Sequence, residues 1–168
     1  MLSQKYETQK YNVIKTMDNF EIRYYPPTIK AKVSSSRNFS KLFQYIRGNN
    51  EKKEKIAMTT PVYMSKKEEK ITMEFVMPSK YSEKNMVQPN DKDIVVYRST
   101  PGYYASIAFG GYASVKKVNH YYDLLLNKIK ERKLKVLGKE PISLSYNSPY
   151  KVFNRRNEVL IEIEYTEN

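Results

Sequence analysis

Residues 37–62 read RNFSKLFQYIRGNNEKKEKIAMTTPV, and this stretch predicts a helix, a charged loop and a strand in succession. Its first apolar residues recur at i, i+3, i+4 and i+7, the spacing of one helix face: Phe39, Leu42, Phe43 and Ile46. Asn38 can cap the start of this helix, and Gly48 suits its end because glycine adopts a left-handed conformation without strain. The β-branched residues and Pro61 of the segment 56–62 favour a strand end or sheet edge.

Short strands with alternating apolar and polar residues are predicted on both sides of this helix. They are expected at 20–25, 28–34, 57–64, 71–77, 93–98, 103–109, 141–146 and 158–165. A second, longer amphipathic helix is predicted by the spacing of Val115, Val118, Tyr122, Leu125 and Ile129.

The order of these elements is strand-strand-helix-strand-strand, and it occurs twice. We therefore expect an α+β fold with two similar halves, at about 11–80 and 92–166, related by a pseudo-twofold axis. Both helices would pack on one curved sheet that closes toward a distorted barrel. Such a sheet leaves a groove where helix and strands meet, a common place for a small ligand.

The composition limits the class of protein. A chain of 168 residues is the size of one domain, 1–168, and without cysteine it has no disulfide or thiolate site. No signal peptide or membrane-length apolar run is visible, so we expect a soluble, cytoplasmic monomer. The net charge of +12 attracts anions, but the lysines are dispersed and there is no arginine-rich arm. Specific nucleic-acid binding is therefore not expected.

Few residues offer metal ligation. His120 is the only histidine, and it shares a polar helix face with Asp123 and Asn127, so a solvated side chain is expected. Possible thioether ligands, which strands more often use as core filling, are Met58, Met64, Met73 and Met77. Tyrosinate ligation is conceivable at two positions, Tyr45 and Tyr150.

No catalytic constellation is visible, and we do not expect an enzyme. One histidine excludes multi-histidine metal sites, no paired carboxylates stand out, and Gly110-Gly111 lacks the spacing of a phosphate loop. Arg155, Arg156 and Glu158 are expected to form a local charge network that fixes their loop.

Several phrases occur in one order along the chain. They are YNVI at 11–14, FEIRYYPP at 20–27, GNNEK at 48–52, KIAMTTPV at 55–62, FGGYA at 109–113 and YNSPYKVFNRRNEV at 146–159. Together they resemble the SOUL haem-binding family over about 11–164. The resemblance implies a distorted β-barrel that carries two helices and is built from two similar halves.

The resemblance also implies binding of haem or related tetrapyrroles in an apolar groove beside the first helix, without a strong axial ligand, as a soluble carrier or buffer. Carried over by position, the binding residues are Phe39, Leu42, Phe43, Gln44, Ile46, Tyr150 and Lys151. A porphyrin needs apolar side chains under its ring and cations near its propionates, which Lys151, Arg37 and Arg47 could supply. Gln44 departs from the basic residue frequent in the family, so one propionate contact is expected to be missing.

Other interpretations remain open. The helix stripe can be plain core, because residues buried against a sheet cannot also cover a porphyrin, so we expect the stripe to divide between core and groove. The architecture is also similar to gyrase-inhibitor-like and AraC effector-binding domains, which bind apolar cations with a buried acid. No acid stands clearly at a core-facing position in this sequence. A protein-interaction domain without a ligand is the third alternative.

Overall fold

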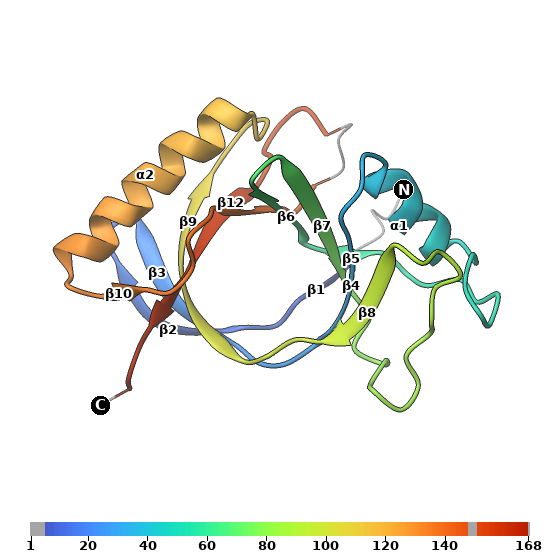
Figure 1. Ribbon diagram of the computed structural model, residues 1–168. Helices are drawn as coiled ribbons and strands as arrows, with labels where there is room; N and C mark the ends of the chain where they lie inside the picture. Colours follow the sequence, from blue (N-terminus) through green and yellow to red (C-terminus); the bar gives the residue numbers. More distant parts are fainter. Residues whose placement is uncertain (1–5, 148–150, 168) are drawn as a thin grey trace. The chain divides into compact units, whose positions relative to one another are not determined.

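The computed structural model describes residues 6–147 and 151–167, which form two compact units (Figure 1). Of the described residues, unit 1 comprises 6–9 and 27–100, and unit 2 comprises 10–26, 101–147 and 151–167. Each unit combines antiparallel strands with one helix. The predicted α+β class is confirmed.

Unit 1 is a four-stranded antiparallel sheet with one helix on it. The sheet order is β8-β4-β7-β6, and a short parallel pair, β1-β5, accompanies it. The elements are β1 (Glu7–Thr8), β4 (Ile29–Val33), α1 (Asn38–Ile46), β5 (Thr59–Thr60), β6 (Val62–Lys67), β7 (Lys70–Val76) and β8 (Ile94–Arg98). In β4 the alternation of the sequence is realised, since Ala31 and Val33 are fully buried and Lys32 is exposed.

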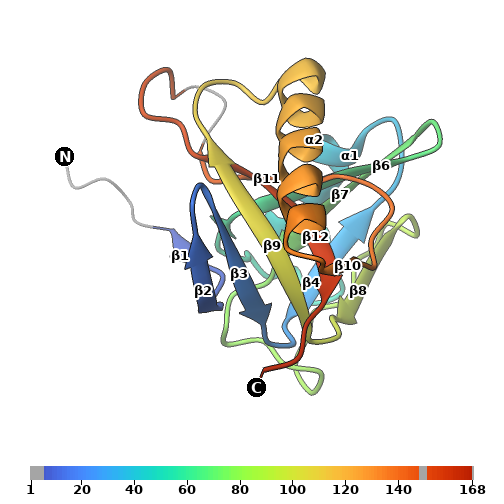
Figure 2. The same ribbon diagram turned by 90° about the vertical axis from the view of Figure 1, so that its left-hand side faces the viewer.

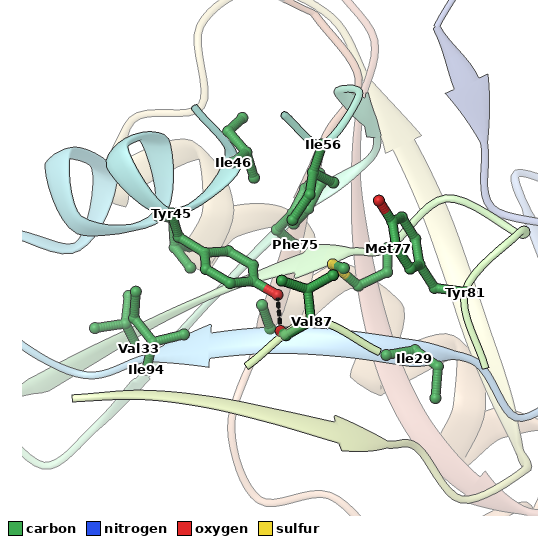
Figure 3. Packing of buried hydrophobic residues seen from close by; sticks show 12 residues of the cluster. Ile29, Val33, Tyr45, Ile46, Ile56, Phe75, Met77, Tyr81, Val87 and Ile94 are labelled. Atoms are coloured by element: carbon green, nitrogen blue, oxygen red, sulfur yellow. Dashed lines mark hydrogen bonds between the residues drawn. The ribbon is translucent and has the colours of Figure 1, made fainter. Parts of the chain in front are cut away.

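The core of unit 1 lies between α1, β4, β7 and the connection after β7 (Figure 3). Tyr45 on α1 is fully buried, and its hydroxyl donates a hydrogen bond to the backbone carbonyl of Val87. Burial raises the pKa of Tyr45 and keeps the phenol protonated as a donor. This bond fixes the irregular connection between β7 and β8 to the helix.

Replacing Tyr45 by Phe should lower the free energy of unfolding by about 1–3 kcal/mol, because the ring still fills the core while the buried Val87 carbonyl loses its donor. Urea denaturation would measure the loss. Tyr6→Phe is a matched control at a half-exposed position, where a change within about 0.5 kcal/mol is expected. Equal stability of the two variants would contradict the assigned role of this hydrogen bond.

Unit 2 is a larger antiparallel sheet in the order β2-β3-β9-β12-β11, with β10 paired to the far end of β12. The elements are β2 (Asn12–Met17), β3 (Phe20–Tyr25), β9 (Gly102–Phe109), α2 (Val115–Glu131), β10 (Lys135–Val136), β11 (Ile142–Ser145) and β12 (Asn157–Glu164). Helix α2 lies along β9 and β12 (Figure 2), and its Leu125 and Ile129 are completely buried there. Within the described ranges, neither helix is long and apolar enough to cross a membrane.

The two units share one arrangement of four strands and a helix, although the strands of each unit come from both sequence halves. In each, a helix connects the second and fourth strands of a four-strand series, β8-β4-β7-β6 in unit 1 and β3-β9-β12-β11 in unit 2. The first strand of each sequence half pairs in the unit formed by the other half, since β3 pairs with β9 and β8 with β4. The compact units therefore do not coincide with the halves 11–80 and 92–166, and internal duplication stays a prediction.

The start of α1 differs from the expectation. Arg37 occupies the N-cap position without a side-chain capping bond, so the predicted cap at Asn38 is wrong. The Asn38 side chain instead accepts from the backbone N–H of Ser35 at 2.5 Å and donates to the carbonyl of Ile71 at 2.8 Å. One of these bonds holds the connection before α1, and the other fastens the helix start to β7. Gly48, after the helix, has φ +124°, as the predicted helix end requires.

The observed strands differ from the predicted ones mainly at Pro61 and where a strand contains only two residues. The strand predicted at 57–64 is divided into β5 and β6 around Pro61, which has no N–H to donate. Three strands were not predicted: β1, β2 and β10. Strands β1 and β10 contain only two residues each, which is too few to show the alternation of apolar and polar residues.

Candidate functional site

An apolar groove lies beside α1 in unit 1. It holds about 40 Å³, and all eight of its lining side chains are apolar: Phe39, Leu42, Phe43, Ile46, Met58, Val62, Met73 and Phe75. The helix supplies four of them, and the remainder come from β6, β7 and the segment before β5. The groove predicted where helix and strands meet is present in this unit.

All four side chains of the helix stripe line the groove, but they differ in exposure to solvent. Leu42 and Ile46 are buried, whereas Phe39 is 59% exposed and Phe43 is 39% exposed. The two phenyl rings stack with their centroids 5.7 Å apart and their planes within 11°. Residues four apart share a helix face, so this geometry follows directly from the spacing in the sequence. The result is a partly exposed, stacked aromatic pair at the mouth of an apolar groove.

Cations flank the aromatic pair. Arg37 and Arg47 are the N-cap and C-cap residues of α1, and a helix of this length separates them by about 15 Å. The Arg47 guanidinium lies 5.0 Å from the centroid of the Phe43 ring, within cation–π range. Lys41 is engaged elsewhere, because its ammonium bonds to Asp91 at 3.0 Å and to Asp93 at 2.7 Å. Arg47 is therefore the cation placed beside the rings.

Two further predicted binding residues, Gln44 and Lys151, are not among the side chains that line the groove. Gln44 is exposed and its amide donates to the Ser40 hydroxyl at 3.5 Å. Lys151 belongs to unit 2, where its side chain is exposed and its carbonyl accepts from Arg155 at 2.7 Å. Tyr150 lies outside the described residues.

The candidate iron ligands fall into different environments. The hypothesis of tyrosinate ligation by Tyr45 is wrong, because its hydroxyl is buried and bonded to Val87. His120 is exposed on α2, as expected, with its ring 5.1 Å from that of Tyr121. Over 6–147 and 151–167, no three histidine or carboxylate side chains form a metal-binding group. Met58 and Met73 are the sulfur-containing side chains in the groove wall.

Sequence reasoning missed a buried ion pair in unit 2. Glu158 is 1% exposed, and its Oε1 accepts from Arg23 Nη1 at 2.9 Å, while its Oε2 accepts from Arg23 Nη2. Unit 2 therefore contains a buried acid, at a position that the sequence did not mark as facing the core. The local network was predicted in part, since Arg156 contacts Glu158 at 3.3 Å. Because 135 residues separate Arg23 from Glu158, no local pattern signals their contact.

Comparison with known proteins decides the family. The model of the SOUL heme-binding protein family matches residues 6–162. The chain belongs to the SOUL family. Heme-binding protein 2 of Homo sapiens is 32% identical over 158 residues, which cover 84% of this chain and 76% of that protein. The SOUL motifs noted above therefore reflect true family membership.

Solved structures share the fold at low identity. A hydrolase from Listeria innocua superposes with a TM-score of 0.62 at 8% identity, covering 96% of this chain and 94% of that one. The EcmrR C-terminal domain gives 0.59 at 12% identity, covering 93% and 99%. At such identities the similarity concerns the fold alone.

Proposed function

We propose that this SOUL-family chain binds haem or a related tetrapyrrole at the α1 groove and acts as a reversible carrier or buffer. The observation that carries the proposal is the exposed, stacked pair of Phe39 and Phe43 at the mouth of an entirely apolar groove. An exposed apolar patch beside a groove is typical of a ligand-binding surface. Family membership and the name of the human relative support a tetrapyrrole as that partner.

In this proposal the groove covers only one face of the porphyrin. Its volume of about 40 Å³ is far below the roughly 300–1,000 Å³ of pockets that enclose a small molecule. A macrocycle would therefore lie across the two phenyl rings and keep its other face in solvent. This partial cover suits reversible uptake, because less apolar area is removed from water than in a closed pocket.

Polar contacts would orient the ring. The two propionates of haem extend from one edge of the macrocycle, so Arg37 and Arg47, about 15 Å apart, would not share them equally. We assign the propionate edge to Arg47, which already lies over Phe43. Haem would bring the iron and the conjugated ring, while Met58 and Met73 offer at most weak thioether contact from the groove wall.

Titration with haemin tests the proposal. The purified chain should give a Soret change that saturates at one equivalent, because the groove accepts one planar ligand. A linear rise in absorbance without saturation would contradict a defined site. Protoporphyrin without iron should also saturate, since the contacts proposed here go to the ring and the propionates.

His120→Ala should leave the haemin titration unchanged within about twofold in dissociation constant, because the imidazole is exposed on α2 and is not part of the groove. The Soret maximum should also stay in place. A shifted maximum or a large loss of affinity would show that this histidine ligates the iron.

A further inference from the structure

Unit 2 contains a second cavity, on the sheet face opposite α2. Residues directly opposite each other on antiparallel strands place their side chains on one face. Glu21 of β3 pairs with Ser106 of β9, and Glu158 of β12 pairs with Ala108 of β9. Their neighbours Ile22 and Ile107 point the other way, into the core beneath α2. The strands therefore carry a polar face behind the apolar one.

The cavity on this polar face measures about 280 Å³. The polar residues that line it include Asp18, Asn19, Glu21, Arg23, Ser106 and Glu158. Its wall thus contains three carboxylates and one guanidinium. Asp18 forms an ion pair with Arg132 at 3.6 Å, and both side chains are exposed. Solvent screens such a pair, so it neutralises little of the negative charge of Asp18.

Arg23 has no donor left for a ligand. Its Nε and one Nη2 hydrogen go to Glu21, at 3.0 and 2.5 Å, and its other bonds reach Glu158 and the Tyr25 hydroxyl. A guanidinium has five N–H groups, and these contacts use all five. An anion in the cavity would therefore find no free N–H on Arg23, and it would be repelled by the carboxylates of Asp18 and Glu21.

Two acceptors at this site have no hydrogen-bond partner among the described residues. Both bonds from Arg23 to Glu21 end on Oε1, and Oε2 of Glu21 has no hydrogen-bond partner within the described ranges. The Ser106 side chain is on the same face, its residue is 2% exposed, and its hydroxyl has no partner among the described residues. A buried hydroxyl without a partner costs about 1–3 kcal/mol, which a ligand that bonds to it would recover.

We propose that this cavity is a binding site for a small organic cation with N–H donors, a guanidinium or primary ammonium group held by Glu21 and Ser106. The excess of carboxylates in the wall and the saturated Arg23 select positive charge. The unpartnered oxygen atoms of Glu21 and Ser106 favour a cation with N–H donors over a quaternary ammonium, which has none. This site consists of unit 2 residues only, so it is separate from the tetrapyrrole groove.

Methylguanidinium is the probe for this site, and amide chemical shifts of the isotope-labelled full chain are the measurement. Shifts around Glu21 and Ser106 should saturate with a dissociation constant of about millimolar, the range accessible to a ligand of so few atoms. Tetramethylammonium, which lacks N–H donors, should bind about tenfold more weakly. Acetate and glycerol should produce no saturable shifts. Equal binding of acetate, or no saturation with methylguanidinium, would overturn the proposal.

Variants separate the proposed contacts. Glu21→Gln keeps the shape and should weaken methylguanidinium binding about tenfold, whereas Glu164→Gln, at an exposed position of β12, should have no effect. Ser106→Ala should weaken it about threefold without loss of thermal stability, because the hydroxyl makes no protein hydrogen bond. Unchanged binding in both Glu21→Gln and Ser106→Ala would exclude this cavity. Haemin titration of the same variants should be unaltered.

Discussion

The double replacement of Phe39 and Phe43 by Asp is expected to abolish the saturable Soret change with haemin. The two rings form the exposed apolar surface at the groove, and each substitution removes that surface and adds a negative charge near the propionates. Loss of two aromatic contacts, each worth about 1.5–3 kcal/mol when covered, corresponds to at least about a hundredfold weaker binding. Titration of wild type and variant at the same concentration measures the difference.

The fold should survive this change because neither side chain belongs to the buried core of unit 1. Leu42→Asp is a poorer test, since Leu42 is buried and the variant would lose stability together with any site. Val115→Asp provides the matched control: it introduces the same charge at an exposed apolar residue of α2 and should leave haemin binding intact. Retained saturation in the Phe39/Phe43 variant would remove the groove from the proposal, whatever else the chain binds.

Replacing Arg23 by Met is expected to lower the free energy of unfolding by about 3–5 kcal/mol, because Glu158 would keep a buried charge without its main partner. The double variant Arg23→Met/Glu158→Leu should recover a substantial part of this loss, since it removes the second charge as well. Urea denaturation of wild type, single and double variants gives the coupling. A single variant as stable as wild type would show that the pair contributes nothing.

Acid should weaken the same pair. Burial alone would raise the pKa of Glu158, but the hydrogen bonds and positive charge of Arg23 outweigh it and hold the pKa below its ordinary value. A depressed pKa contributes stability that is complete above the unfolded pKa of about 4.3 and is lost as the pH falls through the folded value. The urea midpoint of wild type should therefore fall below about pH 4, and Glu158→Gln should show a weaker dependence over that interval.

Local periodicity was sufficient for most elements of this protein. Helices α1 and α2 and strands β3, β4, β9 and β12 were predicted within a few residues, because each contains enough turns or alternations to reveal its buried face. The spacing of Phe39 and Phe43 by four residues also predicts that both rings lie on one side of α1. Family membership was readable for the same reason, since its motifs are continuous segments.

Pairing and burial were decided only in three dimensions. The strands β3 and β8 each pair with strands of the other sequence half, and Arg23 contacts Glu158 across 135 residues. The exposure of Phe39 and the burial of Leu42, three residues apart, likewise depend on neighbours from other segments. The amino-acid sequence by itself determined which residues form helices and strands and to which family the chain belongs. Only the tertiary structure decided which apolar residues stay uncovered and which charges are buried, because solvent exclusion depends on neighbours that local spacing does not specify.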